Sequence, residues 1–286
     1  MGGKFRLSPN QVTRKVFLYC LALAADNFNI DIHCLTIMCN HYHLVVTANH
    51  LNSDLAKFMH CLNLNTALVF NDIQEQRGTF WTPGSYHLSR LNSKDAVMRA
   101  MVYVICNPVQ AGLVRRLENW PGFVSTPGMC VSFNQLQHRP AFFGQLSEKD
   151  ESIRLRFVKP PQFANMTNGQ FIAELEKLVR IRLDEIRAAR RAQGLGFLGA
   201  AHVRNQHFND SPDSNGVIAS VAAFEDNCDA NRFYDEEDDR NYRAFCEQHE
   251  ECLEQVRRGE RPIFPYGTYK MVVTYGYPVA PAPEDG

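Results

Sequence analysis

Residues 36–47 read TIMCNHYHLVVT, with two histidines separated by one residue inside an apolar run rich in β-branched side chains. Such a run predicts a β-strand, in which successive side chains point to opposite faces. His41 and His43 therefore share one face, and Tyr42 points to the other. Two neutral imidazoles side by side form half of a divalent-metal site, so a third ligand has to come from another element. The pair also arises by chance among ten histidines in 286 residues, and alone it is a weak signal.

Composition predicts a soluble globular protein with one large domain or two ordinary ones, because 45% of the residues are hydrophobic. Residues 1–125 carry 11 Lys and Arg against 7 Asp and Glu, and residues 126–286 carry 19 against 24. The mildly basic first half permits nucleic-acid binding without requiring it. Nine cysteines without a C-x-x-C pair fit reduced thiols in a cytoplasmic protein.

The apolar run VFLYCLALAA at residues 16–25 follows two basic residues, which is the outline of a secretory signal. Its apolar residues also recur at helical spacing after Ser8-Pro9, a suitable helix start. We therefore favour a core helix over residues 9–27. No other run approaches the roughly 20 residues of a membrane span, so we expect no membrane partner.

The next residues predict alternating strands and helices. Residues 30–38 and the histidine strand form a hairpin around Cys39-Asn40. Residues 51–72 carry a mostly apolar helical face, and residues 79–91 predict an interrupted strand. Helices and antiparallel strands in this order indicate the α+β class.

A further helix begins at Ser93, a suitable N-cap, and carries Tyr103 and Asn107 four residues apart. Side chains at this spacing lie on one side of a helix. Pro108 disfavours the α conformation for the residue before it, which places Asn107 at the last turn, where the helix ends. The phenol of Tyr103 and the carboxamide of Asn107 are thus expected to project together from the same helix end.

Three motifs resemble the REP-associated tyrosine transposases, which are single-tyrosine HUH transposases related to the insertion-sequence-200 group. The motifs are Met38-x-Asn40-His41-x-His43-Leu44, Arg77-Gly78-x-Phe80-Trp81 and Tyr103-Val-x-x-Asn107-Pro108-Val109-x-Ala111-Gly112-Leu113-Val114. Their order and spacing match over about residues 4–125. The resemblance implies a ferredoxin-like HUH domain over residues 1–125, an antiparallel sheet with helices on one or both faces. A mostly helical C-terminal extension of unknown role follows over residues 126–286.

The resemblance also implies the site. In this family the two histidines and the polar residue four after the tyrosine hold the metal, which assigns His41, His43 and Asn107 to Mg²⁺ or Mn²⁺. Tyr103 becomes the nucleophile, and a metal helps because a phenol with a pKa of about 10 has to attack an anionic phosphodiester. We therefore predict cleavage and rejoining of single-stranded or hairpin DNA through a 5′-phosphotyrosine. Candidate phosphate contacts are Arg90, Arg99, Arg115 and Arg116.

Several alternatives stay open. The chain could be an inactive or domesticated DNA-binding protein of this fold, or a metal-dependent hydrolase that uses water. A zinc site could combine the histidines with Cys34 and Cys39. The family normally has a strand before the first helix, so the short basic N-terminus predicts a truncated first strand and an unpaired sheet edge. A monomer is favoured over a helix-exchanged dimer, because the link before Ser93 is short.

The second half contains no catalytic constellation. A helix predicted near residues 168–193 aligns Arg180, Arg187 and Arg191, which could lie on DNA or form a solvated face. Gly194-x-Gly196-x-x-Gly199 matches the dinucleotide-binding fingerprint only as text, because it follows a helix instead of a strand.

Overall fold

The computed structural model describes residues 3–48, 53–81, 88–141, 143, 151–211, 236–265 and 275–281. Its strands are β1 (Ile30–Ile37), β2 (Tyr42–Ala48), β3 (Asn134–His138) and β4 (Ser152–Arg156). Its helices are α1 (Gln11–Phe28), α2 (Ser53–Ile73), α3 (Lys94–Gln110), α4 (Met129–Ser132), α5 (Asn168–Ala192), α6 (Ala200–Asn205) and α8 (Glu236–Arg257). Short 3-10 turns are η1 (Leu117–Asn119) and η3 (Pro161–Phe163). Small antiparallel sheets with helices against them confirm the predicted α+β class.

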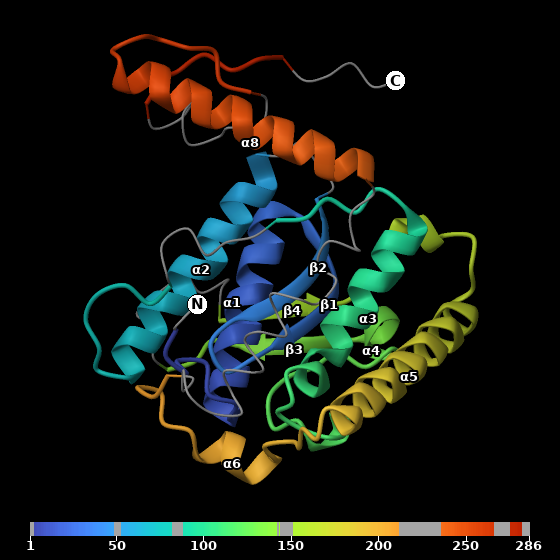
Figure 1. Cartoon of the computed structure of the whole chain (residues 1–286). Helices are drawn as coiled ribbons and strands as arrows, with labels where there is room; N and C mark the ends of the chain where they lie inside the picture. Colours follow the sequence, from blue (N-terminus) through green and yellow to red (C-terminus); the bar gives the residue numbers. More distant parts are fainter. Residues whose placement is uncertain are drawn as a thin grey trace.

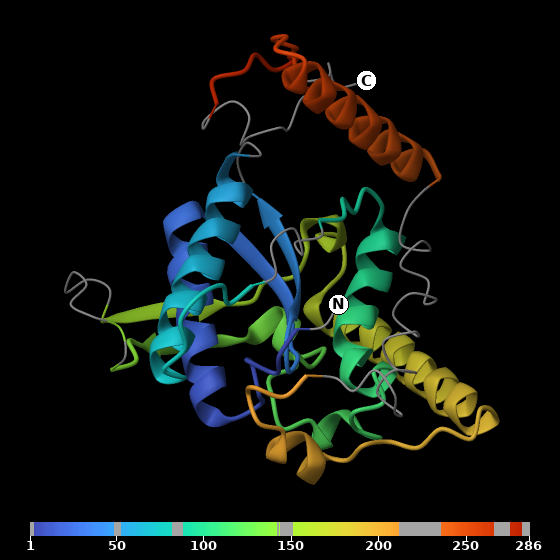
Figure 2. The same ribbon diagram turned by 60° about the vertical axis from the view of Figure 1, so that its left-hand side comes forward.

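The hairpin of β1 and β2 lies between two layers of helices. Helices α1 and α2 pack together on one side of it, α3 packs on the other, and α5 packs on α3 (Figures 1 and 2). Side chains of the two strands therefore divide by face. Tyr42 contacts Phe17 of α1 at 4.9 Å between ring centroids, which leaves the histidine face of β2 for α3.

Helix α1 is a core helix, as predicted. Its N-cap is Asn10, whose side-chain oxygen accepts the Thr13 N–H at 2.8 Å. The helix ends at Asn29 in the left-handed conformation, at φ 52°. Residues 16–24 are all buried, so the apolar run forms much of the core. Within the described ranges, no helix is long and apolar enough to cross a membrane.

Segments far along the chain pair with the edge of β1 opposite β2. An antiparallel bridge joins Thr36 to Val124, and a parallel bridge joins Ile32 to Phe157. The Val158 N–H also donates to the Ile32 carbonyl at 2.8 Å. The expectation of an unpaired edge is therefore wrong. Backbone groups of residues 123–125 and 157–158 form hydrogen bonds with this edge of β1 instead.

The predicted strand at residues 79–91 is wrong in its described parts, and residues 82–87 lie outside the described residues. Residues 79–81 and 88–91 contain no strand. The reason lies in the aromatic side chains, which pack on α2, with Trp81 also meeting the ring of Tyr42 at the start of β2 at 5.7 Å. Trp81 Nε1 donates to the Asn63 carbonyl at 2.9 Å, and Phe80 stacks on Phe70 at 5.7 Å.

Asn107 lies in the last turn of α3, as predicted, but it keeps the helical conformation, which corrects the expectation drawn from Pro108. The helix continues to Gln110, and the Ala111 N–H closes it by donating to the Asn107 carbonyl at 2.8 Å. A proline inside a helix has no N–H for the carbonyl four residues earlier. That carbonyl belongs to Val104, and it accepts a hydrogen bond from the Thr36 hydroxyl.

Part of the predicted extension packs on the first half. Helix α5 begins with a capping box formed by Thr167 and Gln170, and its apolar face joins α3 in one core cluster. Strand β4 packs on α1. The glycine-rich stretch after α5 lies against the turn that follows α3, where Leu198 N–H donates to the Gly112 carbonyl at 2.9 Å. The domain boundary at residue 125 stays a prediction.

Candidate active site

The structure brings the two histidines together, with His43 on β2 and His41 immediately before the strand. Their Nε2 atoms lie 3.0 Å apart, and their ring centroids 4.8 Å apart. A tight turn leads into the strand, since the Met38 N–H donates to the His41 carbonyl at 2.9 Å. Both side chains are half-buried.

Asn40 determines which nitrogen of His41 carries the proton. The Asn40 amide nitrogen donates to the Gly3 carbonyl at 3.3 Å, so its Oδ1 is the atom that faces His41 Nδ1 at 2.7 Å. A carbonyl oxygen only accepts, so Nδ1 is the donor. The His41 Nε2 lone pair therefore points toward His43, which is the arrangement that metal-binding histidines use.

Both imidazoles are neutral near pH 7. Burial lowers the pKa of His41 to about 4. Burial also lowers the pKa of His43 well below its usual value, and the positive charge of a protonated His41 adds to this effect. Neutral rings have free lone pairs for a cation.

Helix α3 places Tyr103 beside this pair. The Tyr103 ring meets the His43 ring edge-on, at 5.3 Å between centroids and 87° between planes. Asn107 follows one turn later on the same side of the helix. Its side chain is only 2% exposed, and no described residue donates to its Oδ1. A buried acceptor without a donor is costly, so this oxygen is suited to a ligand.

The residues fit a hard divalent cation. Two ligands of one octahedral ion, each about 2.1 Å from it, lie about 3 Å apart, which matches the Nε2 separation of 3.0 Å. In the described ranges, no group of three His, Cys, Asp or Glu is placed to hold a metal ion, so a third ligand from this part of the chain has to be of another type. The Asn107 oxygen is such a group.

The zinc alternative is not supported. Burial raises the pKa of the Cys39 thiol to about 12 and that of Cys34 well above its usual value. Cys34, Cys39, His41 and His43 all belong to the described residues, and no three His, Cys, Asp or Glu side chains in that part of the chain are grouped to hold a metal ion.

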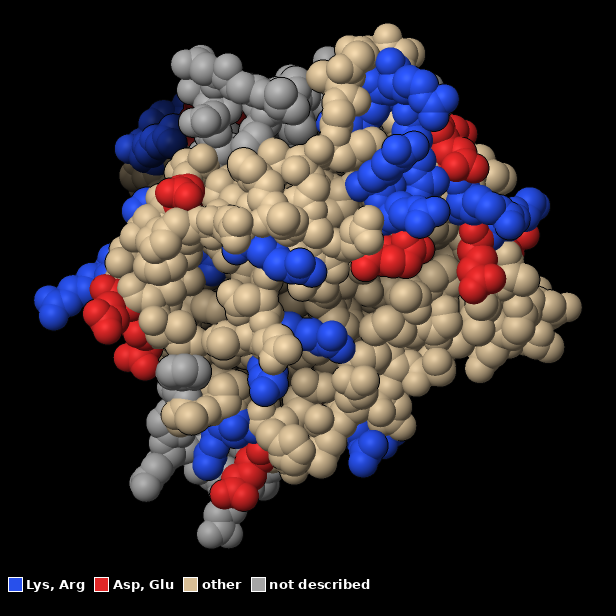
Figure 3. Space-filling model, turned by 90° about the horizontal axis from the view of Figure 1, so that it is seen from below, with Lys and Arg blue, Asp and Glu red and all other residues tan. Residues whose placement is uncertain are grey.

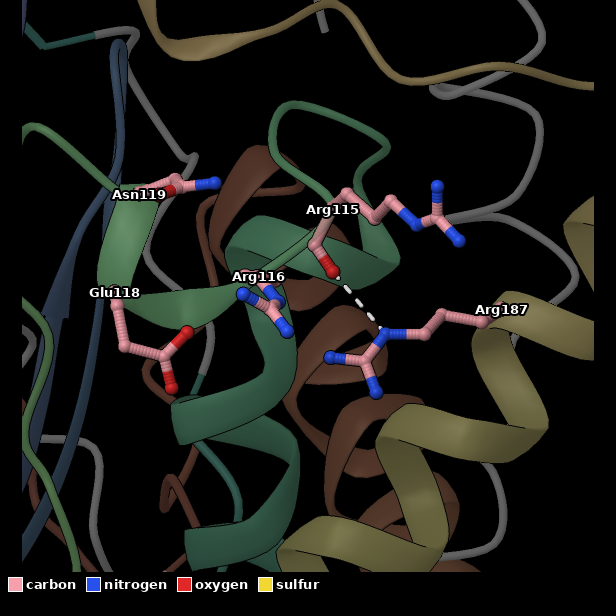
Figure 4. Close-up of a pocket in the computed structure, with 5 residues that line it drawn as sticks. All are labelled: Arg115, Arg116, Glu118, Asn119 and Arg187. Carbon is pink, nitrogen blue, oxygen red and sulfur yellow. Dashed lines mark hydrogen bonds between the residues drawn. The ribbon is translucent and has the colours of Figure 1, made fainter.

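The candidate DNA-contact arginines fall into two groups. Arg90 and Arg99 are exposed, and Arg99 lies on α3 one turn before Tyr103. Arg115 and Arg116 are exposed at the turn after α3 and line a pocket of about 520 Å³ (Figure 4). Seen from below, Lys and Arg side chains gather on the right of the molecule, with Asp and Glu among them (Figure 3).

Comparison with known proteins gives a family match in the first part of the chain. Residues 7–104 match the family model described as IS200-like transposase. These residues are thus similar to the IS200-like transposases. The matched part of the transposase domain contains His41, His43 and Tyr103, and Asn107 follows three residues after it. The chain has no significant match among curated proteins or solved structures.

The match supports transposase activity in general, and it suggests an enzyme that binds and cleaves DNA. Sequence reasoning missed three residues at this domain. Asn40 could have been found as the polar neighbour of the histidine pair, and Thr36 as the hydroxyl of an apolar strand. Arg187 stands out in the sequence only as part of a charged stripe, because its distance from Arg115 along the chain hides their contact.

Proposed function

We propose that this transposase domain cleaves and rejoins single-stranded or hairpin DNA through a 5′-phosphotyrosine on Tyr103. The observation that carries the proposal is the contact between the Tyr103 and His43 rings, with the unpaired Asn107 oxygen one helical turn away. The same chain supplies the strand and the helix, so a monomer suffices for the site.

His41, His43 and Asn107 would hold Mg²⁺ or Mn²⁺. When bound, such an ion supplies charge that polarises the phosphoryl oxygens and offsets the negative charge of the phosphodiester. Asn40 keeps the His41 Nε2 lone pair available, and burial keeps both imidazoles neutral.

Tyr103 then replaces one ester oxygen of the phosphodiester by another. A lone pair on its hydroxyl oxygen forms the new bond to phosphorus, and the bond from phosphorus to the 3′ oxygen breaks with its electron pair. The phenol loses one proton and the 3′ oxygen gains one, so the exchange is balanced without a nucleotide cofactor. Because one ester replaces another, attack by the 3′-hydroxyl reverses the reaction and joins strands.

Position is the main contribution of the protein scaffold. A tyrosine held on a helix approaches phosphorus along one direction, and such orientation contributes much of the rate in phosphoryl transfer. Arg99 lies one turn before Tyr103 and Arg90 just before α3, and both would contact the backbone of the same strand.

The decisive experiment incubates the full chain with a labelled hairpin oligonucleotide and Mn²⁺ or Mg²⁺. A covalent protein–DNA adduct resistant to denaturant is expected, with label from the 5′ phosphate side of the cut. Tyr103→Phe should abolish the adduct. Tyr42→Phe is the matched control, because Tyr42 lies on the other face of β2 and donates to Asn63 at 2.8 Å.

Each alternative gives a different result. An adduct that persists in Tyr103→Phe would show that another residue is the nucleophile. Cleavage without any adduct would favour a hydrolase that uses water. Binding without cleavage at any metal concentration would favour a DNA-binding protein that has lost the chemistry.

A further inference from the structure

A basic pocket lies where α5 meets the turn after α3. Arg115, Arg116, Glu118, Asn119 and Arg187 line its volume of about 520 Å³. In Figure 4 the Arg116 guanidinium lies between the Glu118 carboxylate and the Arg187 guanidinium. A pocket of this size has room for a phosphate with its adjoining sugar.

The charged groups of the pocket are only partly used by the protein. No described residue forms a hydrogen bond or ion pair with the guanidinium of Arg115 or Arg116. Arg187 pairs with Asp184 at 3.1 Å, but Asp184 is 70% exposed, and such surface pairs contribute little. Glu118 is the one carboxylate of the lining. Three guanidinium groups against the carboxylates of Glu118 and Asp184 leave one net positive charge, which favours an anion.

Arg187 is held in place by the turn itself. Its Nε donates to the Arg115 carbonyl at 3.1 Å. Helix α5 thus contributes a guanidinium whose position depends on the backbone of the turn after α3. A pre-oriented guanidinium loses less entropy when it binds, and its planar fork matches two phosphate oxygens.

We infer that Arg115, Arg116 and Arg187 bind a backbone phosphate of the DNA on which Tyr103 acts, which makes α5 part of the DNA-binding surface. The inference rests on the proposed function for the identity of the DNA. Helix α3 connects the arginine pocket to Tyr103. Its rise of about 1.5 Å per residue puts its C-terminal end about 10 Å from Tyr103, a span of a few nucleotides. The positive charge and planar shape of a guanidinium group recognise a phosphate without any contact to a base.

The test measures DNA binding in the Tyr103→Phe background, so that the result does not depend on cleavage. Fluorescence anisotropy with a single-stranded hairpin oligonucleotide gives the affinity at several salt concentrations. Arg115→Gln and Arg187→Gln should each weaken binding roughly three- to tenfold. Each should also lower the slope of log affinity against log salt by about 0.7 to 0.9.

Two controls separate a contact from a folding defect. Arg191→Gln removes an exposed charge from the same helix, outside the pocket lining, and should bind as the parent does. Glu118→Gln should bind more tightly, since it removes the opposing carboxylate. Arg115→Gln breaks no described side-chain bond of the protein, and so tests the charge even if Arg187→Gln loosens the turn.

Equal affinities and salt slopes for the parent, Arg115→Gln and Arg191→Gln would overturn the inference. Competition by inorganic phosphate at constant ionic strength distinguishes the two sources of phosphate. If phosphate displaces DNA from the parent and not from Arg115→Gln, a DNA phosphate occupies the pocket. If Arg115→Gln loses phosphate binding but keeps the parent's DNA affinity, the pocket takes free phosphate and the assignment to DNA is wrong. If the wild type forms no adduct but the arginine variants still lose binding, the proposed chemistry fails and the DNA contact stands.

Discussion

The hydroxyl of Thr36 donates a hydrogen bond of 2.6 Å to the carbonyl oxygen of Val104. Thr36 pairs directly with His43 across the hairpin, so its side chain lies on the histidine face. Val104 follows Tyr103 on α3. Because Pro108 offers no N–H to this carbonyl, the strand provides the donor that the helix lacks, and the bond joins α3 to the hairpin beside the site.

Replacing Thr36 by valine should remove this hydrogen bond between the hairpin and α3. The Val104 carbonyl would be buried without a donor, which costs about 1–3 kcal/mol in the free energy of unfolding. A displaced Tyr103 should also slow adduct formation by roughly 10- to 100-fold. Urea unfolding and single-turnover adduct kinetics measure the two effects, and Thr36→Ser should restore both in large part.

Thr66→Val is the matched control for this prediction. Thr66 is also fully buried, and its hydroxyl donates to the Leu62 carbonyl at 2.6 Å. That carbonyl keeps its place in the backbone hydrogen bonds of α2. An equal loss of adduct rate in Thr66→Val would show that Thr36 acts only through overall stability.

Asn40→Ala should lower metal affinity without removing a ligand. The His41 Nδ1–H would lose its acceptor at 2.7 Å, and the ring would then be free to rotate or to change tautomer. Loss of such a partner typically costs 10- to 100-fold in metal affinity. Mn²⁺ titration followed by electron paramagnetic resonance measures this. Asn63→Ala, which instead affects Tyr42 on the opposite face, should bind Mn²⁺ normally.

Asn107→Ala should separate metal binding from stability. Its Oδ1 has no donor among the described residues, so its removal should change the free energy of unfolding by less than about 1 kcal/mol. Mn²⁺ affinity and adduct yield should both fall. Gln110→Ala provides the reverse case, because Gln110 Oε1 accepts from Arg182 at 3.4 Å. It should cost stability and leave Mn²⁺ affinity intact, and the opposite pattern would argue against Asn107 as a ligand.

Acid should destabilise the fold through His33. Its Nδ1 donates to the Val158 carbonyl at 2.7 Å, its Nε2 faces the Thr47 hydroxyl at 2.8 Å, and burial lowers its pKa. The unfolded chain therefore binds more protons below about pH 6.5. Stability is complete above that pH and falls, by up to about 1.4 kcal/mol per pH unit for this residue, as the pH drops.

Urea unfolding of the metal-free chain between pH 7.5 and pH 5 checks the acid effect. His41 and His43 contribute in the same direction, because their pKa values are lowered too. His33→Gln should therefore flatten the pH dependence in part. The exposed His202→Gln should leave it unchanged, and a wild-type curve that rises toward acid would contradict the prediction.

Local rules in the sequence were sufficient for the parts of the site that depend on neighbours along the chain. The two-residue period of a strand puts His41 and His43 on one face, and the helical period puts Tyr103 and Asn107 on one side. The same local rules failed at Pro108, where a contact from another element supports the helix. They failed again at Phe80 and Trp81, whose strand-like pattern serves to pack on α2.

Only the tertiary structure decided the contacts between residues that are far apart in sequence. Thr36 and Val104 are separated by 68 positions, Arg115 and Arg187 by 72, and His33 and Val158 by 125. No periodicity links such pairs, because they meet only when the helices and strands pack. The sequence by itself determined which side chains point the same way. Packing decided which of them meet, since a carbonyl without its donor or a guanidinium without its partner is satisfied by whichever element folds against it.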